Sequence, residues 1–150
     1  MTAMTREQTL RAACVAIVLF APPLAQAETL DPARTAIIDG DSIAVGAERM
    51  RIMNIDAPET RAARCEAELI KGLAAKARLA EIIRAGGVTV DRCEPDTGRC
   101  HDRYGRALVN LTTPAGADIG HVLIAEGHAL HWAPGHRAKW ARINIWCGRP

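Results

Sequence analysis

Five short β-prone runs surround one long helical segment, and this order limits the folds that the chain can adopt. The runs cover residues 34–38, 42–46, 49–55, 88–93 and 103–111. Asp39-Gly40 separates the first two, and Asp-Gly between apolar runs favours a hairpin. The third run lacks a clean alternation of apolar and polar residues, which predicts a strand with both faces covered. The last two runs predict a second hairpin.

The helical segment covers residues 64–85, where apolar side chains recur at steps of three and four. Gly86-Gly87 ends it, and shorter helices are expected at residues 118–126, with Asp118 as N-cap, and 136–143. Three strands, a helix, two strands and then helices is the layout of an α+β, mainly β fold. We therefore predict a five-stranded Greek-key barrel of the oligonucleotide-binding (OB) type with about three helices.

The N-terminal residues have the pattern of an export signal. Two arginines among the first eleven residues precede an apolar stretch at 12–24, and Ala25-Gln26-Ala27 follows it as a small-x-small cleavage pattern. The alternative, a buried N-terminal helix, conflicts with Pro22-Pro23. We predict that residues 1–27 are a cleaved signal peptide and that 28–150 form one domain. The mature protein would be secreted or periplasmic, without stable membrane association.

The four cysteines downstream of residue 27 predict two disulfides, because an even number in an exported chain is typical of a disulfide framework. Cys93 and Cys100 flank the turn-rich segment 94–98, so we pair them and assign Cys65 to Cys147. The alternative is a four-cysteine zinc site, but the six-residue gap between Cys93 and Cys100 is not a zinc-knuckle spacing.

Three polar blocks lie beside the strand-like runs. They are Asp39-Gly-Asp-Ser42, Arg51-Ile-Met-Asn-Ile-Asp56-Ala-Pro-Glu59 and Asp102-Arg-Tyr-Gly-Arg106. Each block alone is compatible with a charged turn. Together they combine carboxylates, which can hold a hard cation and activate water, with guanidiniums, which can bind phosphate. This combination favours metal-assisted cleavage of a phosphodiester. The net charge of the whole chain is only +2, so polyanion binding requires local clustering of basic residues.

In order and spacing, the three blocks resemble the motifs of the staphylococcal nuclease (thermonuclease) family. Ser42 stands where that family usually has Thr. The resemblance covers roughly residues 35–132. It implies that Asp41 and Asp56 ligate Ca²⁺ through their carboxylates and Ala57 through its backbone carbonyl, with Asp39 as a supporting carboxylate. We also expect Asp39 and Asp41 to point to one side, because they lie two residues apart on an extended segment.

The same resemblance implies the catalytic roles. Glu59 would position and deprotonate the attacking water, and Arg51 and Arg106 would bind the phosphate and stabilise its developing charge. Arg103 and Tyr104 would contact the phosphate or sugar of the bound nucleotide. The reaction would break the bond to the 5′ oxygen of DNA or RNA and leave 3′-phosphates.

One segment departs from the family pattern. Where family members often have tyrosines under the base, this chain has His128-Ala-Leu-His-Trp132. Trp132 could stack on a base, or it could pack under the barrel rim. His128 and His131 could bind a transition metal, although solvated or packed imidazoles are the commoner case.

Two functions follow from these patterns. The first is a monomeric, Ca²⁺-dependent nuclease. The second is a non-catalytic nucleic-acid-binding module on the same barrel. A degenerate binder should have lost at least one of Arg51, Glu59 and Arg106. All three are present, which favours the enzyme.

Overall fold

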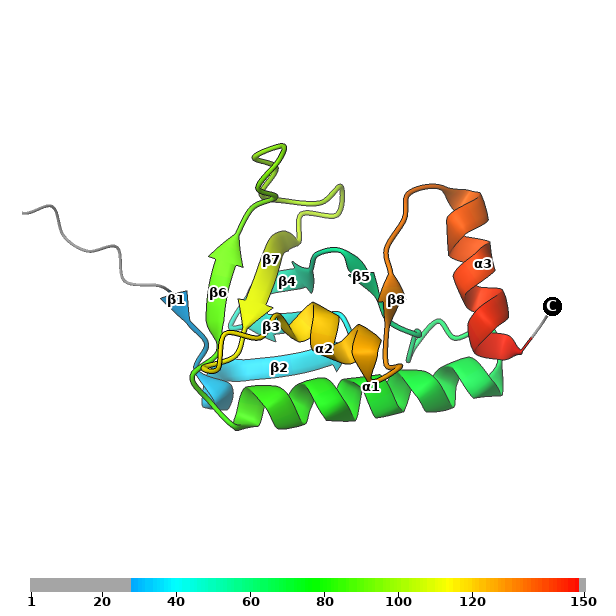
Figure 1. The fold of residues 1–150 in the computed structure, drawn as a ribbon, viewed down its shortest axis with the longest axis horizontal. Helices are drawn as coiled ribbons and strands as arrows, with labels where there is room; N and C mark the ends of the chain where they lie inside the picture. Colours follow the sequence, from blue (N-terminus) through cyan, green and yellow to red (C-terminus); the bar gives the residue numbers. More distant parts are fainter. Residues whose placement is uncertain (1–27, 149–150) are drawn as a thin grey trace, which may run out of the picture.

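The computed structural model describes residues 28–148, and its elements follow the predicted order of strands and helices (Figure 1). In chain order they are β1 (Glu28–Thr29), the 3-10 helix η1 (Pro32–Arg34), β2 (Thr35–Asp39), β3 (Ser42–Val45), β4 (Glu48–Ile52), β5 (Ile55–Asp56), α1 (Glu66–Arg84), β6 (Thr89–Arg92), β7 (Ala107–Thr112), α2 (Ile119–Ala125), β8 (Leu130–His131) and α3 (His136–Cys147). The predicted signal peptide at 1–27 lies outside the described residues.

The strands form a curled half-barrel with the order β1-β6-β7-β4-β3-β2. Strands β4 and β7 pair in parallel, and the other neighbours in this sheet are antiparallel. The short strands β5 and β8 form a separate antiparallel pair. In Figure 1, α1 runs along the base of the sheet and α3 stands beyond β8 at one end. This is the predicted α+β, mainly β fold of OB type, with three α-helices among residues 28–148.

A core of aliphatic side chains joins the sheet to α1 and α2. Ile43, Val109 and Leu111 from the strands are fully buried, and so are Leu79 of α1 and Leu123 of α2. Burial of each such side chain favours folding by about 1.5–3 kcal/mol before the entropy of ordering is subtracted. The core therefore fixes α1 against the half-barrel, next to the β2–β3 turn and the loop after β5.

Two glycines let α1 approach those turns closely. A Cβ atom at Gly40 would lie 2.6 Å from the Cβ of Ala75 and 2.7 Å from that of Ala57, and one at Gly72 would lie 2.7 Å from the carbonyl oxygen of Pro58. Neither glycine has a positive φ. The predicted hairpin at Asp39-Gly40 is present, but its glycine is needed for helix packing and not for a left-handed turn.

The predicted third strand, residues 49–55, is interrupted. Asn54 has a φ of 64°, in the left-handed region that asparagine tolerates better than most residues. The chain therefore turns after Met53, and β5 leaves the main sheet to pair with β8. The prediction that both faces of this run are covered is also wrong in part, because Met50 and Ile52 are buried while Arg49 is exposed.

Two boundaries differ from the sequence-based expectation, and a third agrees with it. Residues 103–106 form a turn before β7 and are not its first residues, because Asp102 NH bonds to Arg106 O and Gly105 NH bonds to Asp102 O. Helix α3 continues to Cys147, beyond the predicted end at 143. Asp118 caps α2 as predicted, since its side chain accepts from His121 NH.

Both predicted disulfides are confirmed: Cys65–Cys147 and Cys93–Cys100. The four-cysteine zinc alternative therefore does not apply. The first bond joins the start of α1 to the end of α3, and Lys71 Nζ also donates to the carbonyl of Trp146 at 2.7 Å. Two disulfides are typical of proteins from an oxidising compartment. Within residues 28–148, no helix combines the length and apolar character needed to cross a membrane.

Candidate active site

Asp41 occupies the turn between β2 and β3 and is buried. Its Oδ1 accepts from Ser42 Oγ at 2.8 Å, and its Oδ2 accepts from Ala57 NH at 3.1 Å. Asp39, at the end of β2, accepts from Asp41 NH at 3.4 Å. Asp41 thus lies in a turn and not on the extended segment that the sequence predicted.

Burial raises the pKa of Asp41 to about 6, and the nearby charge of Asp39 adds to the increase. The guanidinium of Arg51 and the hydrogen bonds from Ser42 and Ala57 act in the opposite direction. A buried carboxylate needs a cationic partner to stay ionised. In this structure the partner is Arg51.

Arg51 extends from β4 and bridges two carboxylates. Its Nη1 donates to Asp41 Oδ2 at 2.8 Å, and its Nη2 donates to Asp56 Oδ1 at 2.9 Å. Nη2 also donates to the carbonyl of Ile55 at 3.1 Å. Burial alone would lower the pKa of Arg51, but the two carboxylates raise it overall. The structure therefore brings together two of the predicted metal ligands and one predicted phosphate-binding residue.

The other oxygen of Asp56 belongs to an ion pair that sequence reasoning missed. Arg142 of α3 donates from Nε to Asp56 Oδ2 at 2.7 Å and from Nη1 to the carbonyl of Ala133 at 3.3 Å. Its side chain is only 8% exposed. No local pattern connects two residues separated by 86 positions. The sequence does contain a weaker indication of a basic helix face, because His136, Lys139 and Arg142 follow one another at a spacing of three.

Glu59 lies on the loop between β5 and α1 and is half-buried. Burial raises the pKa of its carboxyl, the charge of Asp41 adds to the effect, and Lys139 opposes it. The loop is held by a second residue that the sequence analysis missed. Fully buried Glu68 accepts from Arg64 NH at 2.6 Å and from Glu59 NH at 3.4 Å.

Asp102 organises the third polar block. Its Oδ1 accepts from the backbone NH groups of Tyr104 and Arg106, and its Oδ2 accepts from Arg106 Nε at 2.7 Å. Arg106 Nη1 donates to Ser42 Oγ at 3.3 Å, and Ser42 in turn donates to Asp41. The first and third blocks are thus joined by hydrogen bonds through Ser42.

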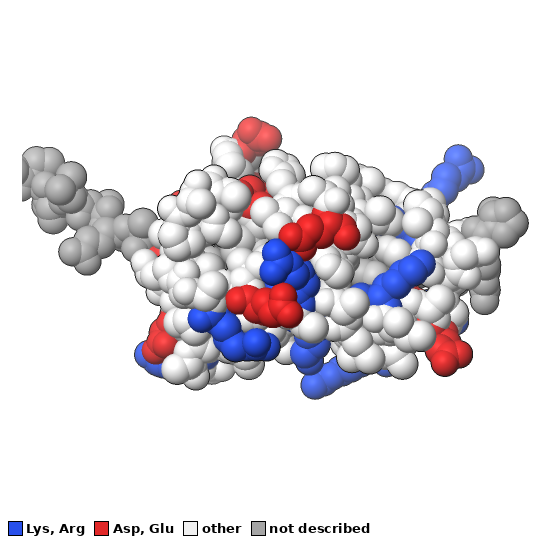
Figure 2. Space-filling model, turned by 60° about the horizontal axis from the view of Figure 1, so that its bottom comes forward, with Lys and Arg blue, Asp and Glu red and all other residues white. Residues whose placement is uncertain are grey.

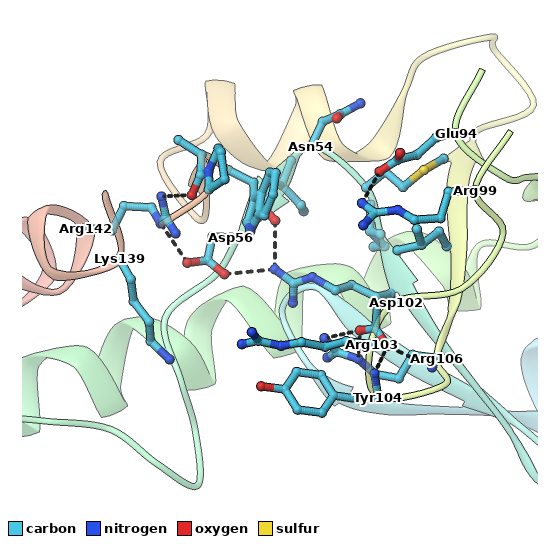
Figure 3. Close-up of a pocket in the computed structure, with 18 of the residues that line it drawn as sticks. Asn54, Asp56, Glu94, Arg99, Asp102, Arg103, Tyr104, Arg106, Lys139 and Arg142 are labelled. Carbon is cyan, nitrogen blue, oxygen red and sulfur yellow. Dashed lines mark hydrogen bonds and ion pairs between the residues drawn. The ribbon is translucent and has the colours of Figure 1, made fainter. Parts of the chain in front are cut away.

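A cleft of about 890 Å³ lies over these groups (Figure 3). Among its lining residues are seven of the predicted site residues: Arg51, Asp56, Glu59, Arg103, Tyr104, Arg106 and Trp132. Asp39, Asp41 and Ala57 are not among them. The lining also includes residues that the sequence analysis did not single out for this site, namely Arg49, Arg99, His136, Lys139 and Arg142. Seven of its side chains are Arg or Lys and four are Asp or Glu, so the local charge is basic.

The two aromatic candidates are open to solvent. Tyr104 is 70% exposed and Trp132 is 44% exposed. The guanidinium carbons of Arg103 and Arg106 lie 4.9 Å and 5.7 Å from the centroid of the Tyr104 ring. The exposure of Trp132 excludes full packing under the barrel rim, and both rings are available to a ligand in the cleft.

The basic character of the cleft contrasts with another face of the molecule. In Figure 2, which brings the base of Figure 1 forward, acidic and basic side chains lie side by side among wide uncharged areas. Among the ion pairs outside the cleft, Arg78 of α1 pairs with Glu81 and with Glu126. Mixed charge of this kind produces no strong field of one sign, so the cleft is the better place for a polyanion.

The histidines form no metal cluster. Within residues 28–148, a single group of three potential metal ligands is close enough to share an ion, and it consists of Cys65, Glu68 and Cys147. Both of its cysteines are in the disulfide. Neither His128 nor His131 belongs to it. Within residues 28–148, His128 and His131 thus belong to no group of three such ligands, and neither do the carboxylates Asp39, Asp41 and Asp56.

An OB-type half-barrel with a basic cleft over ion-paired carboxylates defines a class of protein suited to binding a phosphate backbone. The family model described as staphylococcal nuclease homologue matches residues 49–144. The chain belongs to this family of nucleases, whose fold implies nucleic-acid binding. A search of curated proteins gave no match. The matched residues include the second and third polar blocks and most of α3, while Asp39-Gly-Asp-Ser42 lies before them.

Proposed function

We propose that this protein is a Ca²⁺-dependent nuclease that hydrolyses DNA, RNA or both and leaves 3′-phosphates. The observation that carries the proposal is the bridge from Arg51 to Asp41 and Asp56, at 2.8 Å and 2.9 Å, beside a basic cleft. It joins oxygen donors suited to a hard cation with a guanidinium suited to phosphate. We further propose that the protein is an exported monomer, secreted or periplasmic.

The residues present fit a calcium ion in their chemistry. Asp41 and Asp56 would supply carboxylate oxygens and Ala57 a carbonyl oxygen, all of them hard donors. Both carboxylates already contact one positive group, the guanidinium of Arg51. Asp41 is buried, so it needs a positive charge nearby to stay ionised. Asp39 would support Asp41, because the carboxylate of Asp39 accepts a hydrogen bond from the backbone NH of Asp41. When bound, the cation would supply Lewis-acid stabilisation of a phosphate oxygen.

The protein's own groups would carry the remaining chemistry. Glu59 would take a proton from water as the water oxygen forms its bond to phosphorus and the bond to the 5′ oxygen breaks. Burial and neighbouring carboxylates raise the pKa of Glu59, and a raised pKa makes a carboxylate a better general base near neutral pH. The departing 5′ oxygen would take a proton from solvent water, and the phosphate would remain on the 3′ side.

Arg51 and Arg106 would stabilise the charge on the phosphate oxygens. A guanidinium has five N–H donors, and the hydrogen bonds of Arg51 to Asp41, Ile55 and Asp56 use three of them. In this arrangement two donors of Arg51 remain for a phosphate, and a cation held by Asp41 and Asp56 would free the donors that now bind those carboxylates. Asp102 and Ser42 hold Arg106 in a similar way. Arg103, Tyr104 and Trp132 would bind the adjoining nucleotides.

The test is a cleavage assay on defined single-stranded DNA, double-stranded DNA and RNA, with Ca²⁺ or with a chelator. We expect cleavage only with the metal and products that carry 3′-phosphates, identified by end-group analysis. Equal activity in the chelator would remove the proposed roles of Asp41 and Asp56. Binding without cleavage would favour the alternative, a non-catalytic nucleic-acid-binding module.

A further inference from the structure

Asp56 is held from two sides by two different arginines. Its Oδ1 receives Arg51 Nη2 at 2.9 Å, and its Oδ2 receives Arg142 Nε at 2.7 Å. Arg51 reaches it from strand β4 of the half-barrel. Arg142 reaches it from α3, as Figure 3 shows. The orientation of this carboxylate is therefore set by two separate parts of the fold.

Arg142 is itself fixed in position. It is buried, and its second hydrogen bond, to the carbonyl of Ala133, ties it to the segment that leads into α3. The helix is anchored to α1 near its other end by the Cys65–Cys147 disulfide and by the hydrogen bond from Lys71 to Trp146. A guanidinium held in this way can orient a carboxylate and is not a mobile surface charge.

We propose that Arg142 is a positioning residue for the cation site: it holds Asp56 through Oδ2 and leaves Oδ1 to Arg51, the guanidinium that also binds Asp41. This inference rests on the proposed function. It makes the disulfide-anchored helix α3 a part of the active centre and not only a wall of the cleft.

The geometry assigns positioning, and not competition, to Arg142. Arg51 links Oδ1 of Asp56 to Oδ2 of Asp41, so both oxygens are bound by the same guanidinium. Arg142 uses the other oxygen of Asp56. Binding of a cation by Asp41 and by Oδ1 of Asp56 would therefore displace Arg51 and leave the contact of Arg142 with Asp56 in place. Hydrogen bonds that orient a ligating carboxylate typically change metal affinity by about 10- to 100-fold.

Calcium titration by calorimetry, without nucleic acid, tests the inference. We expect Arg142→Gln to bind Ca²⁺ about 10- to 100-fold more weakly than the wild type. We expect Arg142→Lys to be similarly impaired, because an ammonium keeps the charge but lacks the planar fork that reaches both Asp56 and Ala133. Arg137→Gln is the matched control, since Arg137 is exposed on the same helix, and it should bind as the wild type does.

An unchanged affinity for Ca²⁺ in both Arg142 variants would overturn the inference. Tighter Ca²⁺ binding would also overturn it, because it would show that Arg142 competes with the cation for Asp56. If wild type and Arg137→Gln bind Ca²⁺ and cleave nucleic acid, such results leave the proposed function intact. A wild type that binds no Ca²⁺ would remove both proposals.

Circular dichroism in chelator would reveal an Arg142 variant that does not fold. A second measurement, on the wild-type protein, then tests the inference without a variant. In the wild-type protein, the NMR signal of Arg142 Nε–H should stay protected from solvent exchange when Ca²⁺ is added. Loss of that protection on calcium binding would show that Arg142 leaves Asp56, and this would overturn the inference without any variant.

Discussion

Arg51 lies between Asp41 and Asp56 and donates one nitrogen to each, at 2.8 Å and 2.9 Å. The three residues come from the β2–β3 turn, strand β4 and strand β5. The guanidinium of Arg51 therefore neutralises the buried carboxylate of Asp41. It also holds Ile55 and Asp56, the first residues after the break in the strand at Asn54. This relationship makes the stability of the cation-free site depend on Arg51.

Replacement of Arg51 by Met should destabilise the protein in chelator. Removing one partner of a largely buried ion pair leaves the other charge uncompensated, at a cost of about 3–5 kcal/mol. Arg51→Lys keeps a charge but cannot reach both carboxylates, so it should lie between Arg51→Met and the wild type. Urea denaturation in chelator measures these differences. Equal midpoints for all three proteins would mean that Arg51 does not stabilise the buried Asp41.

Asp41 should give the cation-free protein a specific pH dependence. Its pKa is raised from 3.8 to about 6 on folding. The native state therefore binds more protons than the unfolded state between these values, so the stabilisation is complete below about pH 3.8 and is lost as the pH rises through about 6. The melting temperature in chelator should show a larger fall in the wild type than in Asp41→Asn, which keeps only the smaller contribution of Glu59, whose pKa is also raised. Parallel curves would contradict the assignment.

Glu59→Gln should lower kcat by about 10²- to 10⁴-fold, because an amide cannot accept the proton of the attacking water. KM and the melting temperature should change little, since the contact that holds this loop uses the backbone NH of Glu59. Glu66→Gln is the control, because Glu66 is exposed at the start of α1. Single-turnover cleavage measures the chemical step. Near-normal cleavage by Glu59→Gln would assign the base to another group.

The sequence predicted the parts of the site whose members lie close together in the chain. Asp39 to Asp41, Arg51 to Glu59 and Asp102 to Arg106 are short blocks whose spacing carries the pattern. The hairpins, the long helix and the disulfides also follow from local turn, periodicity and cysteine signals. The contact between Asp56 and Arg142 spans 86 positions, and only tertiary packing brings it about.

Some local expectations failed because tertiary contacts outweighed the pattern. An extended segment at Asp41 would have pointed its side chain to the same side as that of Asp39, but the two-residue turn buries Asp41 under Ala57. A continuous strand at 49–55 satisfied the apolar pattern, but Asn54 redirects the chain. Both departures bring carboxylates toward Arg51. The turn and the break that the strand pattern missed therefore contribute directly to the candidate site.

Tyr104 and Trp132 should contribute to substrate binding more than to chemistry. Stacking of a base on an aromatic ring is worth about 1–3 kcal/mol, so Trp132→Ala should raise KM by about 5- to 150-fold with kcat little changed. Tyr104→Ala should also raise KM, because it removes a contact to phosphate or sugar. Trp140→Ala is the control, because Trp140 is also exposed but does not line the cleft. Steady-state kinetics on an oligonucleotide distinguishes the variants. An unchanged KM for Trp132→Ala would remove that residue from the binding surface.

The two disulfides should differ in their effect on stability. They close segments with sequence separations of 82 for Cys65–Cys147 and 7 for Cys93–Cys100. The chain-entropy model assigns about 4 kcal/mol to the longer loop and about 2 kcal/mol to the shorter one. Replacing each pair with Ser and measuring denaturant unfolding should reproduce this order, and a thiol assay should find no reactive cysteine in the oxidised mature protein. A larger loss in the Cys93→Ser/Cys100→Ser protein would contradict the entropic ranking and show that its loop stabilises the native state by direct contacts.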